Sequence, residues 1–378
     1  MKVTQFSYRP ASGWSNIPAN CSENTLVLAF AEQPFGEQPQ VWKQLREKTG
    51  KATVLACSTA GGIQGPEMQD DVIVGAVAEF EKTTIKFVST SIADGEDSLQ
   101  AGERIAAALP KDKLTAVFVL SAGLGVNGSE LVKGISSHLP KNVTLSGGLA
   151  GDGTRFQSTW VLDGESPQPH CVAAIGFYGS DIHFAYGSQG GWDKFGIERR
   201  ITKANGSELY ELDGKPALKL YKEYLGDRAA ELPAAGLLFP LAVRPELQSD
   251  KFLVRTILQV DEKKQSLVFA GDVPTGSYAQ LMRANFERLI QGAANAAQMA
   301  QNPAEQKGDA LAIAISCVGR KAILGARAED ELDAAFSMMP AGTKQVGFYS
   351  YGEVAPNGSG GPCQFHNQTM TITRFYEG

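Results

Sequence analysis

Long apolar segments are missing from this sequence. No apolar run reaches about 18 residues, the length that a membrane-spanning helix requires. The N-terminal stretch, residues 1–25, contains no apolar core of the length found in signal peptides. We therefore expect a cytoplasmic chain that does not insert into a membrane.

Cysteine and basic charge are also scarce. The five cysteines lie far apart and are odd in number, which is typical of a reduced cytoplasmic chain and argues against a disulfide framework. The formal net charge is −6, and Lys and Arg form no block. Nucleic acid and anionic membranes are therefore not expected as partners. The sequence contains no recognisable kinase or DNA-binding motif, so we expect a separate protein to provide any output.

The sequence does have the composition of an ordinary globular protein. Hydrophobic residues make up 43% and charged residues 20% of its 378 residues. A chain of this length exceeds the usual size of a single hydrophobic core, which predicts two domains. The 41 glycines among 378 residues are a larger share than the average of roughly 7%, which predicts many tight turns.

The order of secondary-structure patterns predicts an α+β fold. Short apolar strands alternate with helices up to about residue 150, and residues 158–187 have the pattern of consecutive antiparallel strands. This change of pattern predicts mixed sheets with helices packed on them, in two domains.

Two local patterns are more specific. The strand-like runs 72–80 and 83–90 are separated only by Glu81 and Lys82, which predicts a hairpin. Residues 278–301 predict the longest helix, and its Ala-rich face would be the contact surface if the chain were purely an interaction protein.

A strand–helix–strand order occurs twice and predicts an internal pseudo-repeat. Residues 115–162 contain a buried strand, a helix, a Gly-rich turn and another strand, and residues 311–372 repeat this order. Each copy places an acidic residue after a glycine between two strands, Asp152 in the first and Glu353 in the second. Two related domains facing each other would bring both acidic turns to a common cleft.

Chemically versatile side chains gather near the C-terminus. Residues 347–375 predict two strands joined by a loop rich in Gly, Pro and Asn. A loop that only connects strands does not need such groups, and loops held by rigid strands often carry binding residues. The groups in question are Tyr349, Tyr351, Glu353, Cys363, His366 and Asn367.

Four motifs resemble those of the FIST family of sensory domains, and they occur in the family's order. They are ACSTAGG (56–62), SGGLAGDG (146–153), ISCVGR (315–320), and GFYSYGEVAP with FHNQTMTITRF (347–356 and 365–375). Residues 201–226 are similar to the junction between the family's two halves. The resemblance implies a FIST N-terminal sensory domain over 1–200 and a FIST C-terminal domain over 201–378.

The resemblance also implies a function. The family's general expectation is a sensor of a small polar metabolite, such as an amino acid, that regulates a separate signalling protein. Its specialised expectation is a haem-based nitric oxide sensor that acts on a histidine kinase. No cofactor is certain from the sequence, and haem is the one to consider.

We expect the ligand to lie in a cleft between the domains, because each motif lies at or just after a predicted strand end. Backbone N–H groups of residues 58–62 could bind a carboxylate. Arg320 could clamp a carboxylate bidentately, with Asp152 or Glu353 receiving an ammonium group. The alternative for Arg320 is a structural ion pair. The predicted ligand-binding residues are Cys57, Ser58, Thr59, Gly61, Gly147, Gly148, Asp152, Arg320, Tyr349, Tyr351, Glu353, His366 and Asn367.

Two histidines are candidates for an axial haem ligand. His366 lies in the C-terminal loop and His183 lies within a predicted strand, although a purely structural role is open for both. The sequence has no C-x-x-C-H motif for covalent attachment of haem. The family often has a Cys and a Pro after the SQG at 188–190, but this chain continues GWDKFG, so the role of that Cys is not carried over.

Catalysis and nucleotide binding are the remaining alternatives. Cys57 could act as a nucleophile with His366 as its base, but free cysteines are more often buried and inert, and we expect no enzyme. Residues 123–128 fit G-x-G-x-x-G, the dinucleotide fingerprint. They do not follow the first strand of a βαβ unit and lack the expected acidic partner, so we interpret them as a tight strand-to-helix turn.

Overall fold

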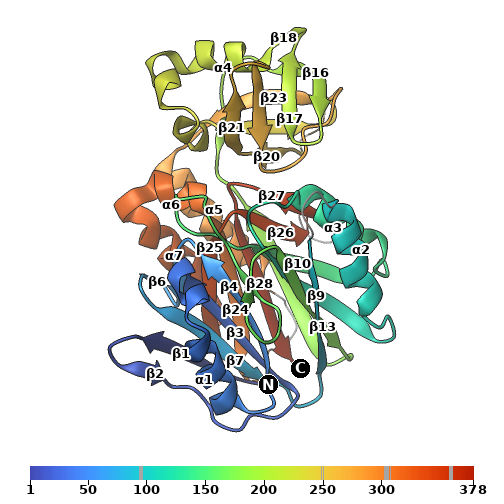
Figure 1. Cartoon of the computed structure of the whole chain (residues 1–378), viewed down its shortest axis with the longest axis vertical. Coiled ribbons are helices and arrows are strands. Elements are labelled where there is room, and N and C mark those ends of the chain that lie inside the picture. The colour runs from blue at the N-terminus through green and yellow to red at the C-terminus, as the bar shows by residue number, and fades with distance from the viewer. Residues whose placement is uncertain (93–96, 248, 250, 302–305, 307, 357–360) are drawn as a thin grey trace.

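The computed structural model describes residues 1–92, 97–247, 249, 251–301, 306, 308–356 and 361–378. They form a large body of three sheets, and a smaller lobe, residues 193–283, stands on one end of the body (Figure 1). The predicted α+β fold with mixed sheets is confirmed. No helix in the described part of the chain is long and apolar enough to cross a membrane.

The first sheet of the body is built on two parallel strands, β3 and β4, with β7 antiparallel beside β3. Helix α1 (Pro39–Thr49), preceded by the 3-10 turn η1 (Gln33–Glu37), makes the crossover between β3 and β4. The strands of the first sheet in spatial order are β12 (Pro167–Gln168), β11 (Val161–Leu162), β4 (Thr53–Thr59), β3 (Thr25–Glu32), β7 (Ile73–Glu79), β1 (Lys2–Arg9) and β2 (Gly13–Ser15).

The second sheet repeats this plan with β9 and β10 parallel and β13 antiparallel beside β9. Helix α3 (Gly128–Ser137) makes the crossover and packs against α2 (Ser98–Ala108). The strands in spatial order are β27 (Cys363–His366), β26 (Gly352–Pro356), β10 (Thr144–Leu149), β9 (Leu114–Ser121), β13 (Cys171–Tyr178) and β8 (Thr84–Ser91).

The third sheet repeats the plan again with β24 and β25 parallel and β28 antiparallel beside β24. The crossover contains α6 (Val318–Leu324), η4 (Gly325–Arg327) and α7 (Ala328–Ser337), while α5 (Phe286–Met299) packs on β14 and β28. The strands in spatial order are β14 (Ile182–Gln189), β28 (Met370–Glu377), β24 (Ala310–Cys317), β25 (Thr343–Ser350), β5 (Gly62–Gln64) and β6 (Glu67–Gln69).

The three units interlock by exchanging hairpins. After β4 the chain enters the third sheet, where β5 pairs with β25, and after β25 it enters the second, where β26 pairs with β10. After β10 it enters the first sheet, where β11 pairs with β4. The exchange is cyclic, so the body contains three copies of the unit that the sequence order showed twice. The sequence order does not reveal the unit containing β3 and β4, because no acidic residue directly follows the glycines of its turn.

The lobe has a sheet and a hydrophobic core of its own. Helix α4 (Ala217–Leu225) packs on the sheet, followed by the 3-10 turns η2 (Gly226–Glu231) and η3 (Ala234–Leu237). The strands are β15 (Asp193–Lys194), β16 (Arg199–Asn205), β17 (Glu208–Leu212), β18 (Lys215–Pro216), β19 (Leu241–Arg244), β20 (Leu253–Arg255), β21 (Ile257–Asp261), β22 (Ser266–Phe269) and β23 (Tyr278–Arg283).

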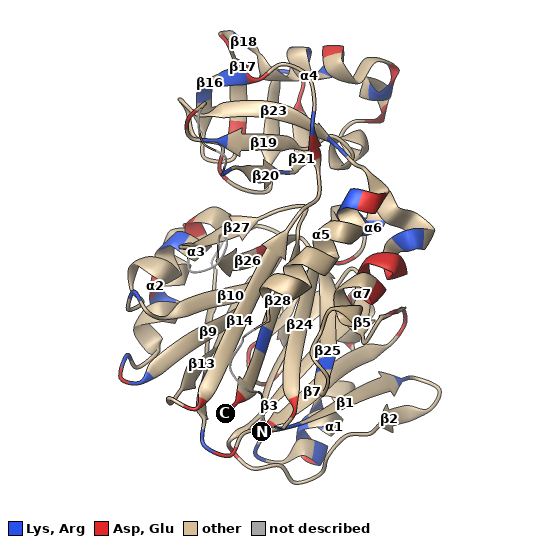
Figure 2. Cartoon of the chain, turned by 180° about the vertical axis from the view of Figure 1, so that it is seen from behind, with Lys and Arg blue, Asp and Glu red and all other residues tan. Residues whose placement is uncertain are grey.

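The expected boundary at residue 200 falls inside β16. Strands from both sides of it share the third sheet, where β14 pairs with β28 along its whole length. The division into domains 1–200 and 201–378 therefore stays a prediction. The separation that is visible in space is between the lobe and the body (Figures 1 and 2).

Helix starts follow local capping chemistry. The side chain of Asn127 accepts hydrogen bonds from the N–H groups of Ser129 and Glu130 and so begins α3. In the same G-x-G-x-x-G stretch, a Cβ on Gly123 would lie 1.8 Å from the carbonyl oxygen of Ala150. The backbone at this turn is therefore packed against protein, which fits a tight turn and leaves no space there for a pyrophosphate.

The predicted helix 278–301 starts too early. Residues 278–283 form β23, which pairs with β16 and β19 in the lobe, and the helix begins only at Phe286. The side chain of Asn285 accepts a hydrogen bond from the N–H of Arg288 and caps the helix. Tertiary pairing with two lobe strands overrides the helical pattern of these residues.

The predicted hairpin at Glu81 and Lys82 is wrong, because β7 and β8 belong to different sheets. Glu377 on β28 holds the turn between them. Its carboxylate accepts hydrogen bonds of 2.7–3.0 Å from the N–H groups of Glu81, Lys82 and Thr83. It also lies 3.2 Å from the N-terminal ammonium group of Met1.

We expect Glu377→Gln to destabilise the fold at neutral pH by about 2–3 kcal/mol. Burial alone would raise the pKa of Glu377, but the three N–H groups outweigh it and lower the pKa to about 2. The stabilisation is therefore present above the unfolded pKa of about 4.3 and is lost as the pH falls toward 2. Urea unfolding between neutral and acidic pH measures this. An acid-induced loss as large in the variant as in the wild type would contradict the assignment.

Candidate functional site

The Gly-rich turns that end β4, β10 and β25 meet at the centre of the body. The structure therefore brings together the stretches 57–62, 147–152 and 349–351, which the sequence predicted to converge. Three backbone hydrogen bonds join them: Ala60 N–H to the Tyr349 carbonyl (2.9 Å), Gly151 N–H to the Ser58 carbonyl (3.0 Å) and Tyr351 N–H to the Leu149 carbonyl (3.1 Å).

This meeting point is sealed. The side chains of Ser58, Thr59 and Tyr349 are buried. The N–H groups considered for carboxylate binding are used internally, since Gly61 N–H donates to the hydroxyl of Thr59 (3.0 Å) and Ala60 N–H to Tyr349. The turns thus join the three units of the body, and neither of the cavities described below reaches them.

Asp152 anchors a loop. Its carboxylate accepts hydrogen bonds of 2.9 Å from the N–H groups of Phe156, Gln157 and Ser158, and another from the hydroxyl of Tyr351. Burial opposes the charge, but these donors outweigh it and lower the pKa of Asp152. With its oxygens so engaged, Asp152 has a structural explanation that requires no ligand ammonium group.

Glu353 lies in a second buried position. Its carboxylate accepts hydrogen bonds from the hydroxyl of Ser350 (2.7 Å) and from the N–H and hydroxyl of Thr369 (3.2 and 2.8 Å). Burial raises the pKa of Glu353 to about 7, although the Ser350 and Thr369 donors act in the opposite direction. Glu353 therefore changes charge near neutral pH inside the body.

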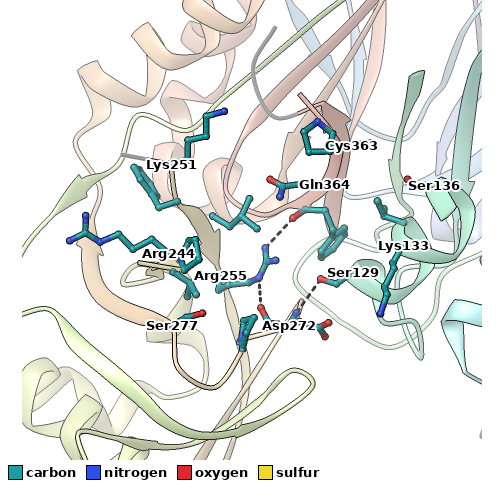
Figure 3. A pocket seen from close by; sticks show the side chains of 18 of the residues that line it. Ser129, Lys133, Ser136, Arg244, Lys251, Arg255, Asp272, Ser277, Cys363 and Gln364 are labelled. Atoms are coloured by element: carbon teal, nitrogen blue, oxygen red, sulfur yellow. Dashed lines mark hydrogen bonds between the residues drawn. The ribbon is translucent and has the colours of Figure 1, made fainter. Parts of the chain in front are cut away.

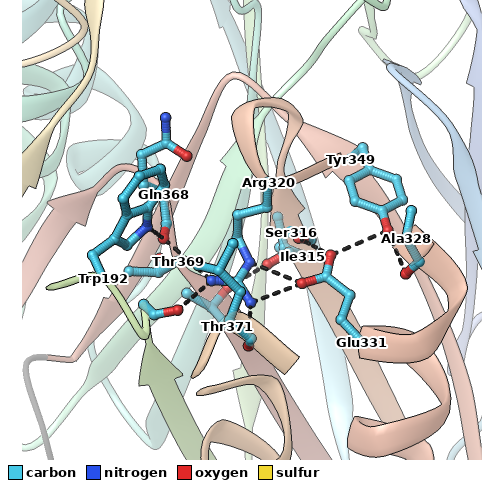
Figure 4. A network of polar contacts seen from close by, with 12 residues as sticks. Trp192, Ile315, Ser316, Arg320, Ala328, Glu331, Tyr349, Gln368, Thr369 and Thr371 are labelled. Carbon is cyan, nitrogen blue, oxygen red and sulfur yellow. Dashed lines mark hydrogen bonds and ion pairs between the residues drawn. The ribbon is translucent and has the colours of Figure 1, made fainter. Parts of the chain in front are cut away.

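Arg320 and Glu331 form an ion pair in which both side chains are completely buried, with Nη2 2.7 Å from the carboxylate. Arg320 also donates to the carbonyl oxygens of Gly190 and Leu289 (Figure 4). Gly190 precedes the lobe and Leu289 follows it, so Arg320 fixes both chain segments that connect lobe to body. The guanidinium has the structural ion pair that the sequence analysis gave as the alternative to a ligand clamp.

Cys57 is completely buried in the hydrophobic core of the body. Burial raises the pKa of its thiol well above the ordinary value, so the thiolate that a nucleophile requires is disfavoured. Its surroundings are therefore those of an inert core cysteine.

The two candidate haem ligands lie in different places. Nε2 of His366 donates to the carbonyl of Ala355 (3.1 Å), and burial lowers the pKa of His366 to about 4. Nδ1 of His366 makes no hydrogen bond to the described residues. His183 lies near the other end of the third sheet, with its ring 5.3 Å from that of Tyr376. Asn367, the residue after His366, is buried, and neither of its side-chain polar atoms has a hydrogen-bond partner among the described residues. The described residues contain no cluster of His, Cys, Asp or Glu suited to a metal ion.

Two adjoining cavities open where the lobe meets the body. The first, of about 800 Å³, lies between α3, β27 and the lobe strands β19 and β20 (Figure 3). The second, of about 520 Å³, lies between α5, the end of β14 and the segment before β20. Lys251 and Phe252 line both cavities. Of the predicted ligand-binding residues, His366 alone contributes to their lining.

Sequence patterns single out His366 and Cys363 but none of the other side chains that line these cavities. Arg255 is a charged residue within the apolar run FLVRTILQV (252–260). A charge in such a run is a signal of a buried functional or structural contact. The other side chains with charge or large apolar surface in the first cavity are Lys133, Arg244, Lys251, Phe252, Asp272 and Phe365.

The comparisons with known proteins match both halves of the chain. The model of the FIST N domain matches residues 25–215, and the model of the FIST C domain matches residues 217–356. The uncharacterized protein MJ1623 of Methanocaldococcus jannaschii is 25% identical over 367 residues, which cover 87% of this chain and 68% of that protein. The junction between the two family matches lies at β18 in the lobe.

Proposed function

Because the chain belongs to the FIST family, whose domains are sensory domains of signal transduction, we propose that it senses a small ligand bound between the lobe and the body. We further propose that the bound state regulates a separate signalling protein, with a histidine kinase as the first candidate. An amino acid is the ligand to test first from the family resemblance.

One observation carries the proposal: the two adjoining cavities are lined from both sides of the lobe–body junction. Phe252 and Lys251 come from the lobe, while Ser129 and Val132 come from α3, and Gln291 and Asn295 come from α5. Pockets of several hundred Å³ between two structural units are the usual sites for small ligands.

A ligand in this position can act as a signal because its contacts depend on the orientation of the lobe relative to the body. A ligand shifts a conformational equilibrium only when it binds one state better than the other. Two chain segments, around Gly190 and Ala284, connect the lobe to the body, and Arg320 holds the residues next to them. The lobe can therefore change its orientation relative to the body while these attachment points stay fixed. Such a domain movement is a recognised form of switching.

A ligand screen with a structural readout tests the proposal. Amino acids, organic acids, nucleotides and uncharged metabolites would be screened for an increase in melting temperature, and each positive compound followed by small-angle X-ray scattering. We expect at least one compound to stabilise the protein and to reduce its radius of gyration. Phe252→Ala should weaken the binding of that compound by about tenfold or more, through loss of buried apolar contact.

Leu247→Ala is the matched control, because Leu247 is an exposed lobe residue that lines neither of the two cavities. It should leave binding unchanged. A ligand that binds equally well to Phe252→Ala, or that leaves the scattering curve unchanged, would count against the proposed site and its switching role.

His366 gives the haem alternative one supporting observation, since it lines the second cavity. Ligation through Nε2 would require loss of its hydrogen bond to Ala355, which leaves Nδ1 as the available nitrogen. The absorption spectrum of the protein with added haemin separates the alternatives. A sharp Soret band that weakens in His366→Ala supports haem, whereas our small-ligand proposal expects the spectrum of haemin to be the same as with a non-binding control protein.

A further inference from the structure

Arg255, at the end of β20, has a buried cationic group that has no acidic partner in the described part of the chain. Its side chain is only 3% exposed. Nε donates to the carbonyl of Asp272 (2.9 Å), and Nη1 donates to the carbonyl of Phe365 (3.0 Å) (Figure 3). Nη1 also donates to the carbonyl of Val254 (3.3 Å). All three acceptors are neutral. Among the described residues, Arg255 forms no ion pair, and its Nη2 has no hydrogen-bond partner.

This arrangement is unusual on energetic grounds. A buried charge is normally paired, because removal from water is only offset by an opposite charge and by hydrogen bonds. Arg320 follows this rule through Glu331. Arg374 also pairs with no carboxylate of the residues that the structure describes, but its guanidinium lies 5.0 Å from the centre of the Tyr376 ring and lines neither of the two cavities. Arg255 differs because it lines the first cavity.

Burial lowers the pKa of Arg255 to about 10, with a partly compensating contribution from the charge of Asp272. The guanidinium therefore remains charged at neutral pH. The carboxylate of Asp272 accepts a hydrogen bond from the side chain of Asn127 (2.8 Å) and is the acidic group in the described lining. It forms no ion pair with Arg255, so the cavity keeps an uncompensated positive charge.

The surrounding side chains extend this positive character. Lys133 on α3 and Lys251 before β20 both line the cavity and are exposed to solvent. Arg244 lines it as well, but it is paired with Glu198. Apolar surface is provided by Val132, Phe252, Leu253 and Phe365. The cavity thus combines cationic groups with an apolar wall.

We propose that the first lobe–body cavity binds an organic anion, whose carboxylate or phosphate group is received by Arg255 and whose apolar part packs against Phe252 and Phe365. Lys133 and Lys251 attract the anion and contact it at the mouth of the cavity. The free Nη2 of Arg255 supplies a charge-assisted hydrogen bond to the anion. The inference rests on the proposed function, because it names the ligand class of the same cleft.

The test uses matched probes of known charge. Benzoate and phenyl phosphate carry the two candidate anionic groups on one apolar ring, while benzamide and benzyl alcohol are uncharged counterparts. Calorimetric titration of the full chain should show binding of at least one anion, about tenfold or more tighter than its uncharged counterpart. The anion that binds more tightly shows whether the site prefers a carboxylate or a phosphate group. Inorganic phosphate tests whether the apolar part is needed, and it should bind more weakly than phenyl phosphate if phosphate is the preferred group.

Variants then locate the binding group. Arg255→Gln should weaken anion binding by about tenfold or more, and Arg255→Lys should restore part of it by restoring the charge. The double variant Lys133→Gln/Lys251→Gln should weaken binding less and reduce its dependence on salt, because both lysines are exposed. Lys219→Gln is the matched control: Lys219 is exposed on α4 of the lobe and lines neither cavity, so binding should be unchanged.

Three results would overturn the inference: no binding of either anion at millimolar concentration, equal binding of benzoate and benzamide, or full anion affinity in Arg255→Gln. If Arg255→Gln fails to fold, the lysine double variant and the comparison of charged with uncharged probes still decide the matter. A separate outcome concerns the proposed function. An uncharged compound that binds the cleft and moves the lobe would leave the sensor proposal intact while the anion inference fails.

Discussion

Replacing Arg320 by Leu is expected to lower the free energy of unfolding by about 3–5 kcal/mol. The change leaves the carboxylate of Glu331 completely buried, and among the described residues it keeps hydrogen bonds only from the hydroxyls of Ser316 and Tyr349. It also removes the hydrogen bonds that Arg320 donates to the carbonyls of Gly190 and Leu289, which lie in the two chain segments between lobe and body. Urea unfolding of wild type and variant measures the loss.

The double variant Arg320→Leu/Glu331→Leu should recover part of this stability, because no unpaired charge then remains in the core. Arg327→Leu is a surface control: Arg327 pairs with Glu287 and Asp330, is 40% exposed, and should cost no more than about 1 kcal/mol. If Arg320→Leu costs as little as the Arg327 variant, the pair is not the buried clamp described here.

Gly147→Ala is expected to cost about 3–5 kcal/mol, from backbone strain and overpacking together. Gly147 has a φ of 146°, a conformation that favours glycine. A Cβ at this position would lie 1.8 Å from the carbonyl oxygen of Val119 on the parallel strand β9. The clash would separate β9 from β10 next to the sealed centre where the three units meet. Chemical denaturation of the purified variant measures the effect.

Gly65→Ala provides the comparison. Gly65 has a φ of 62°, but a Cβ there would have no heavy atom within 4 Å, so only the backbone cost of about 1–2 kcal/mol applies. Equal losses in the two variants would show that contact with β9 contributes nothing. A larger loss for Gly147 supports a structural role for a residue that the sequence assigned to ligand binding.

The convergence of the sequence motifs was predictable for a physical reason. Buried apolar runs ended by Gly-rich turns mark strand ends, and the turns after β4, β10 and β25 do meet. Their use was not predictable. Whether the N–H of Ala60 is free for a ligand or bonded to Tyr349 depends on a chain segment nearly three hundred residues away. Asp152 and Arg320 were predicted to contact a ligand, but in the structure their charged groups bind protein partners.

The sequence by itself determined the family, the α+β class and the starts of helices such as α3, because these depend on motifs, periodicity and capping groups close together in the chain. Tertiary structure alone decided the cyclic exchange of hairpins, the burial of Cys57 and the position of the open cavities. A strand of two or three residues has no sequence pattern that specifies its sheet. The role of the charge on Arg255 likewise depends on tertiary structure, because β20, α3 and β27 surround it and no carboxylate in the described residues pairs with it.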